Sequence, residues 1–144
     1  VVPLGGGGLL AGAALAARGH TRTVRMIGAE AEGSPVFTTA LAAGAITPIV
    51  VTDTLADGLA GNLEPGSQTF ALVRDHVDAV AVVAESSLET AMRGLLYRER
   101  LVTEGAGAAA VAALLQGGLG LDGGPVGVMI TGRNIDASTL RRIL

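Results

Sequence analysis

The stretch Val1-Val2-Pro3-Leu4-Gly5-Gly6-Gly7-Gly8-Leu9-Leu10-Ala11-Gly12 decides the fold of this chain. A short apolar run comes first and is typical of a buried strand, and the Ala- and Leu-rich residues at its end favour a helix. The glycines between them have no side chains, so a ligand can approach the backbone closely. The sequence therefore predicts a strand, a bare loop and a helix N-terminus, an arrangement that binds phosphate groups through amide N–H donors.

Apolar runs and helical patterns alternate along the rest of the chain. We expect strands over residues 23–28, 77–84 and 125–130, helices over residues 9–18, 36–43, 88–96, 108–116 and 136–144, a helical turn over residues 70–75, and a long loop over residues 52–69. Pro35 is expected at the first position of its helix, and the spacing of Ser86 and Glu89 predicts a capping box. This alternation indicates an α/β fold with a doubly wound, mostly parallel sheet.

The composition restricts the possible functions. A length of 144 residues is typical of one domain, so we treat residues 1–144 as a single α/β unit. The net charge is −3 and the basic residues are scattered, which argues against a nucleic-acid partner. The sequence contains no cysteine, which excludes disulfides and thiolate chemistry. The apolar runs are shorter than a membrane span, so we expect a cytoplasmic protein without a membrane partner.

One interpretation of the opening stretch is a dinucleotide site. Gly6, Gly8 and Ala11 follow the first strand with the spacing of the dinucleotide-binding fingerprint. Glu30 follows the next predicted strand, where an acidic side chain binds a ribose hydroxyl. Glycine-rich sequences also produce this pattern by chance, and it explains nothing after residue 30.

A second interpretation explains more of the chain. Val2-Pro3-Leu4-Gly5-Gly6-Gly7-Gly8-Leu9 is similar to the tetraglycine phosphate loop of the serine/threonine dehydratases, which are fold-type II enzymes that use pyridoxal phosphate. Further segments resemble that family's T-I-A-D-G, E-G/P-x-A/G and S-G-G-N-x-D motifs, namely Thr54-Leu55-Ala56-Asp57-Gly58-Leu59, Glu104-Gly105-Ala106-Gly107 and Thr131-Gly132-Arg133-Asn134-Ile135-Asp136. Because four motifs occur in the family's order over nearly the whole chain, the sequence is identified as a member. The resemblance implies the large cofactor-binding domain of a tryptophan synthase β-like enzyme.

The resemblance also implies how the cofactor is bound. It assigns the cofactor phosphate to the backbone of Gly5, Gly6, Gly7, Gly8 and Leu9. Thr131 stands where the family has Ser, and its hydroxyl would bond the pyridine nitrogen. Glu104 would lie against the cofactor ring, and Asp57 and Gly58 would form the wall of the pocket.

Each of these side chains also has an ordinary structural explanation. An acid such as Glu104 is favourable at a helix N-terminus, and Asp57-Gly58 is a common turn sequence. Arg133 replaces the family's second Gly, and its side chain points either toward a substrate carboxylate or into solvent.

No metal site and no histidine-dependent chemistry are expected. The family's cation site uses an acid, a carbonyl and an Asp, for which this chain offers Glu30 and Ser34 but has Val36 in place of the Asp. Without that carboxylate, a hard cation is bound poorly. His20 follows a helix and His76 precedes a strand, and we expect neither to be catalytic.

The resemblance implies an ammonia-lyase that β-eliminates water from serine, threonine or a related hydroxy amino acid to give a 2-oxo acid and ammonia. This reaction needs a lysine as covalent anchor and general base, but all 10 basic residues here are arginine. We therefore expect a C-terminal part, without catalytic residues of its own, of an enzyme whose upstream part carries the lysine and a small domain. We expect the intact enzyme to be a homo-oligomer. The alternatives are a non-catalytic cofactor-binding module and an NAD-type domain.

Overall fold

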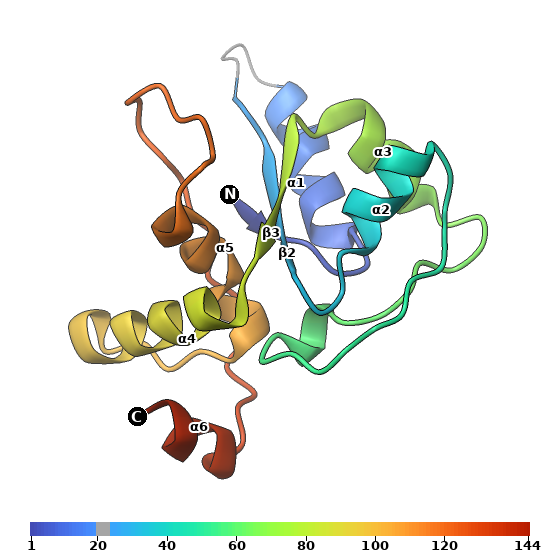
Figure 1. Ribbon diagram of the computed structural model, residues 1–144. Helices are drawn as coiled ribbons and strands as arrows, with labels where there is room; N and C mark the ends of the chain where they lie inside the picture. The colour runs from blue at the N-terminus through green and yellow to red at the C-terminus, as the bar shows by residue number, and fades with distance from the viewer. Residues whose placement is uncertain (20–23) are drawn as a thin grey trace.

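A three-stranded parallel sheet lies at the centre of the computed structural model, which describes residues 1–19 and 24–144 (Figure 1). Its strands are β1 (Val2–Pro3), β2 (Ile27–Ala31) and β3 (Ala79–Val83), in the order β1-β2-β3. Val2 pairs with Gly28, and Ile27 pairs with Ala79. Because the strands are parallel, all of their carboxyl ends lie at one edge of the sheet.

Helices cover both faces of the sheet (Figure 1). One face carries α1 (Gly8–Arg18), α2 (Val36–Ala43) and α3 (Gln68–His76). The other carries α5 (Gly105–Gln116) and α4 (Glu85–Gly94), which continues as the π-helical segment η2 (Leu95–Glu99). The short helix α6 (Ala137–Ile143) packs against α4, and the 3₁₀ turn η1 (Asp57–Leu59) lies in the long loop. The prediction of an α/β fold with a doubly wound parallel sheet is confirmed.

Alternating side chains of β2 explain the two hydrophobic cores. Ile27, Ala29 and Ala31 pack on the α5 side, where the buried α5 alanines allow the helix to lie close to the sheet. Gly28 points to the α1 side, where an added Cβ would lie 2.7 Å from Cδ2 of Leu4. Small residues on both β2 and α5 therefore bring the helix close to the sheet on one side, and the missing Cβ of Gly28 makes room for Leu4 on the other.

Two predicted strands differ from the structure. Residues 125–130 form no strand among the described residues, although Val1 donates to Gly127 (2.7 Å) and accepts from Met129 (3.0 Å). Because β1 has only two residues, residues 125–130 can form too few hydrogen bonds with it to become a fourth strand of the sheet. β2 begins at Ile27 rather than at residue 23, which lies outside the described residues together with His20.

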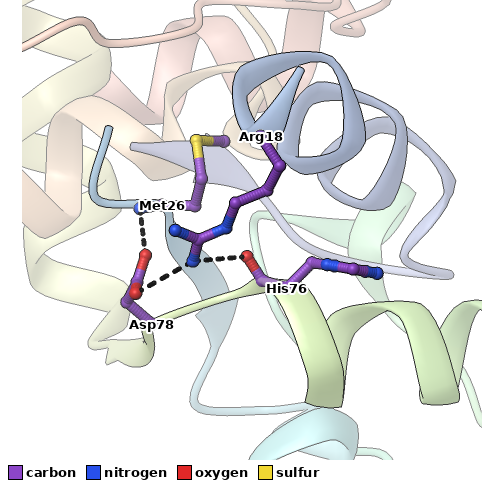
Figure 2. Close-up of polar contacts among 4 residues, drawn as sticks. All are labelled: Arg18, Met26, His76 and Asp78. Carbon is purple, nitrogen blue, oxygen red and sulfur yellow. Dashed lines mark hydrogen bonds and ion pairs between the residues drawn. The ribbon is translucent and has the colours of Figure 1, made fainter. Parts of the chain in front are cut away.

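A polar network at the amino ends of β2 and β3 explains where β2 begins (Figure 2). The Asp78 carboxylate accepts from the Met26 amide (2.7 Å) and from the Arg18 guanidinium (3.1 Å). Arg18 also donates to the carbonyl of His76 (3.3 Å). Because Met26 donates to a side chain, regular strand pairing starts one residue later.

Three local predictions also differ from the structure in detail. Ser86 lies inside α4 rather than at its cap, because the amide of Glu85 already donates to Glu32 Oε1 (2.8 Å). Pro35 is the N-cap of α2 rather than its first helical residue. The expected turn over residues 70–75 is the full helix α3, whose Phe70 and Val73 are buried against α1 and α2.

Among the described residues, no helix combines the length and the apolar character that a membrane crossing requires.

Candidate functional site

The four motif segments predicted to form a site meet at the carboxyl edge of the sheet. The glycine loop follows β1 directly, and a Cβ on Gly5 would lie 2.9 Å from Cα of Leu59. A Cβ on Gly105 would collide with the carbonyl of Leu55, and one on Gly107 with the carbonyl of Gly132. These glycines are therefore required because backbone packs directly on backbone where the segments meet.

The glycine loop is held by its packing against α2 and α3. Gly7 has φ +85°, and a Cβ there would lie 2.6 Å from Cζ of Phe37. The Thr69 hydroxyl donates to the carbonyl of Gly6 (2.8 Å). Because a trans peptide directs its C=O and N–H to opposite sides, this bond turns the Gly7 amide away from α3.

The amides of this loop suit an anion. Within the described part of the chain, no N–H from Gly5 to Leu10 donates to a protein acceptor, and the first bond of α1 runs from Ala11 to Gly7 (2.9 Å). Cβ atoms on Gly6 and Gly8 would have no neighbour within 4 Å. A row of unpartnered amides at the N-terminus of an eleven-residue helix, beside open space, fits a phosphate group.

The segment with Asp57 and Gly58 forms one side of the site. The Asp57 carboxylate accepts from the Gly58 amide (2.8 Å), so this acid stabilises its own turn. A Cβ on Gly58 would lie 3.1 Å from Cβ of Ala106 and 3.8 Å from Oε1 of Glu104. The ordinary turn explanation and the predicted role of Asp57 and Gly58 as a wall of the pocket are therefore compatible.

Glu104 joins two of the motifs. It is the N-cap residue of α5, but its carboxylate accepts from the amide of Asn134 (2.8 Å) rather than from α5. Its own amide donates to the carbonyl of Gly132 (3.1 Å). The side chain fills the space beside Gly132, where no Cβ could be accommodated. Its contacts are therefore with the last motif and not with the amides of the helix that it begins.

Thr131 and Arg133 flank this contact, and both are exposed. The Thr131 amide lies 3.4 Å from the carbonyl of Gly107, which places the residue beside the N-terminal turn of α5. A cavity of about 100 Å³ is lined by residues of three motifs, among them Thr54, Asp57, Glu104 and Asn134, but Thr131 is not among its lining residues.

Glu30 has a structural role. Its carboxylate is fully buried and accepts from the amides of Phe37 (2.9 Å) and Thr38 (2.8 Å) in the first turn of α2. Burial raises the pKa of the Glu30 carboxyl, and these amide bonds oppose that shift. Because the Glu30 carboxylate is fully buried and already accepts two amide hydrogen bonds, it is not placed to bind a ribose hydroxyl as the dinucleotide interpretation predicted.

Ser34 and Val36, which stand at the other two positions of the family's cation site, also stabilise α2 and the loop beside it. The Ser34 hydroxyl lies between the carbonyl (3.2 Å) and the amide (3.0 Å) of Gly61, and Val36 is buried. Within residues 1–19 and 24–144, no three acidic or histidine side chains gather as they would around a metal ion.

Two residues that contact the motif segments were not predicted. Thr69 bonds the glycine loop, and Glu85 accepts from the amide of Leu55 (2.7 Å) and from the hydroxyl of Thr54. Thr69 is distant in sequence from Gly6, and Glu85 is distant from Thr54 and Leu55. The only signal for Glu85 was its position directly after a predicted strand.

Comparisons with known proteins agree with this geometry. A family model described as "Pyridoxal-phosphate dependent enzyme" matches residues 1–132. The L-threonine ammonia-lyase of Geobacter sulfurreducens is 43% identical over 140 residues, which cover 97% of this chain and 35% of the relative. The catabolic L-threonine dehydratase TdcB of Escherichia coli K12 is 40% identical over 145 residues, which cover 99% of this chain and 44% of the relative.

Solved structures are similar as well. Maize serine racemase superposes with a TM-score of 0.87 at 35% identity, covering 98% of this chain and 44% of that chain. The threonine deaminase of T.th. superposes with a TM-score of 0.84 at 36% identity, covering 94% of this chain and 49% of that chain. The chain thus spans less than half the length of each of these relatives.

Proposed function

The chain belongs to the family of pyridoxal-phosphate dependent enzymes, and from this premise we propose that it is part of an amino-acid ammonia-lyase. The reaction is β-elimination of water from threonine, serine or a related hydroxy amino acid, which gives a 2-oxo acid and ammonia. The names of the two relatives at 40% and 43% identity support this choice over the racemase activity in the name of the maize protein.

The observation that carries the proposal is the row of glycine-loop amides without a protein acceptor. We infer that Gly5, Gly6, Gly7, Gly8 and Leu9 bind the cofactor phosphate, which brings the opposite charge to the N-terminus of α1. The open space at Gly6 and Gly8 leaves room for that group, and the packing at Gly5 and Gly7 holds the loop in position.

The other motif residues would surround the ring. Asp57 and Gly58 provide one wall, and Glu104 lies between them and the turn of Gly132. Thr131 would offer its hydroxyl to the pyridine nitrogen. A hydroxyl does not hold that nitrogen protonated as a carboxylate does, which favours elimination over chemistry that needs a stronger electron sink. The cofactor, when bound, supplies the electron sink for removal of the substrate α-proton.

The proposal includes a second part of the protein that carries the catalytic lysine. This chain contains no lysine, so its 144 residues form the α/β portion that holds the phosphate and the pyridine ends of the cofactor. We further propose a cytoplasmic homo-oligomer that acts on a small amino acid without nucleic-acid or membrane partners. The net charge of −3 with scattered arginines supports the absence of a polyanion partner.

The test uses the intact protein. It should carry pyridoxal phosphate in an imine that borohydride fixes to a lysine outside these residues, and it should form 2-oxobutanoate from L-threonine or pyruvate from L-serine. Absence of the imine would overturn the proposal. Bound cofactor without 2-oxo acid formation from any hydroxy amino acid would favour a non-catalytic module. Stoichiometric NADH binding that pyridoxal phosphate does not displace would favour the dinucleotide interpretation.

A further inference from the structure

Glu85 connects the carboxyl end of β3 to the wall of the candidate site. It is the first residue of α4, and its carboxylate accepts from the hydroxyl of Thr54 and from the amide of Leu55 (2.7 Å). Its own amide donates to Glu32 Oε1 (2.8 Å), and the amide of Glu32 donates to the carbonyl of Val83 (2.9 Å). The side chain therefore extends from a fixed position on the sheet to a loop 30 residues earlier in the chain.

The hydrogen bonds made by Thr54 and Leu55 show why a carboxylate is needed at position 85. The Thr54 oxygen accepts from the amide of Ala56 (3.1 Å), so its single proton is directed to Glu85. The Leu55 amide is a second donor to the same carboxyl group. The two donors reach different oxygens, Thr54 reaching Oε1 and Leu55 reaching Oε2, and a carboxylate has an acceptor oxygen at both positions whereas a carboxamide has a donor NH₂ group at one of them.

The segment that Glu85 holds is fixed from its other side by α5. The carbonyl of Leu55 packs on Gly105 so closely that no Cβ would fit, and Gly105 follows Glu104 directly. Two residues after Ala56, Gly58 lies beside Ala106 and the Glu104 carboxylate. A shift of residues 54–56 would therefore displace both Asp57-Gly58 and the N-terminus of α5.

The geometry points to Glu85 as a positioning residue of the cofactor site, one that sets the wall of residues 54–58 without touching the cofactor. This inference rests on the proposed function for the identity of the ligand. It assigns a site role to an acid outside the four motifs, through contacts that only the folded chain brings together.

The first experiment compares Glu85→Gln with Glu89→Gln in the intact protein. Glu89 lies one turn further along α4 and loses the same charge, but its carboxylate bonds Arg93 at the surface (3.2 Å). In Glu85→Gln, a charge-assisted hydrogen bond is lost and the wall of residues 54–58 is displaced. The kcat/KM of this variant should therefore fall about tenfold or more, and its affinity for pyridoxal phosphate should fall by a similar factor. Glu89→Gln should change neither by more than about twofold.

A second pair of variants separates positioning from general stability. Thr54→Ser keeps the hydroxyl and should retain cofactor affinity, whereas Thr54→Val should weaken it as Glu85→Gln does. The double variant Glu85→Gln/Thr54→Val should be no worse than the poorer single variant, because both changes break the same contact. Additive losses would overturn the inference.

Hydrogen exchange provides a readout that does not depend on activity. In Glu85→Gln, exchange should accelerate in residues 52–60 while the melting temperature stays within the range of Glu89→Gln. Acceleration throughout the protein, or none in residues 52–60, would overturn the positioning role. If the intact protein binds no pyridoxal phosphate, the proposed function fails, but the exchange comparison still tests whether Glu85 holds this segment.

Discussion

Gly7 has two constraints that no other residue type satisfies. Its φ of +85° lies in the left-handed region that side chains disfavour, and its missing Cβ makes room for the ring of Phe37. The neighbouring glycines differ in their surroundings. Gly5 packs on Leu59, whereas Gly6 and Gly8 face open space. The loop is therefore packed against the protein at Gly5 and Gly7 and faces open space at Gly6 and Gly8.

Replacing Gly7 by alanine should weaken pyridoxal phosphate binding by at least about tenfold, since the loop must move to relieve the collision with Phe37. Equilibrium titration of the intact apoprotein by cofactor absorbance measures this change. Gly12→Ala is the matched control, because a Cβ there has no neighbour within 4 Å and alanine is the better helix former. Equal affinities of Gly7→Ala and Gly12→Ala would contradict the described loop geometry.

Glu30 should contribute to stability rather than to catalysis. Glu30→Gln leaves one acceptor oxygen for the two amide donors of Phe37 and Thr38, so the variant should lose about 1–3 kcal/mol of unfolding free energy. Thermal unfolding of the intact protein measures the loss, with the exposed Glu99→Gln as a control that should be nearly neutral. A variant as stable as the parent would mean that the buried carboxylate does not cap α2.

At the scale of elements, the two edges of the sheet carry different sets of contacts. The amino ends of β2 and β3 are tied by Asp78 and Arg18 (Figure 2). The carboxyl ends lead into the glycine loop, Glu30 and Glu85. The carboxyl edge, where parallel α/β sheets usually bind ligands, is thus the edge at which the motif segments meet.

The Asp78 contact should depend on pH. The Met26 amide first, and then Arg18, hold the pKa of the Asp78 carboxyl below its ordinary value of 3.8. A lowered folded-state pKa contributes stability that is present above pH 3.8 and is lost as the pH falls through the folded pKa. Asp78→Asn should therefore be less stable than the parent at pH 6, and the difference should shrink below pH 3.8.

Urea unfolding of the intact protein at pH 6, 4 and 3 checks this dependence. Glu64→Gln removes an exposed loop carboxylate and should show no comparable change with pH. A difference between Asp78→Asn and the parent that stays constant down to pH 3 would show that the carboxylate charge does not contribute to the contact.

At the scale of the whole molecule, the sequence predicted what depends on local pattern. The glycine loop, the helix over residues 88–96 and the alternation of strands and helices could all be predicted from the sequence. Residues 125–130 have strand propensity but lack a long partner, and Ser86 has cap-like spacing but competes with Glu32, so both predictions were wrong. The contacts of Thr69 and Glu85 join residues 63 and 30 positions apart, which no local pattern reveals.

The central claim is that the glycine loop of this chain holds the phosphate of pyridoxal phosphate. The most direct test is amide NMR of the intact protein labelled with ¹⁵N-glycine and titrated with the cofactor. The amides of Gly5, Gly6, Gly7 and Gly8 should shift downfield together and saturate at about one equivalent, as N–H groups do when they donate to an anion. Saturating cofactor that leaves these four resonances unchanged while it shifts others would contradict the claim.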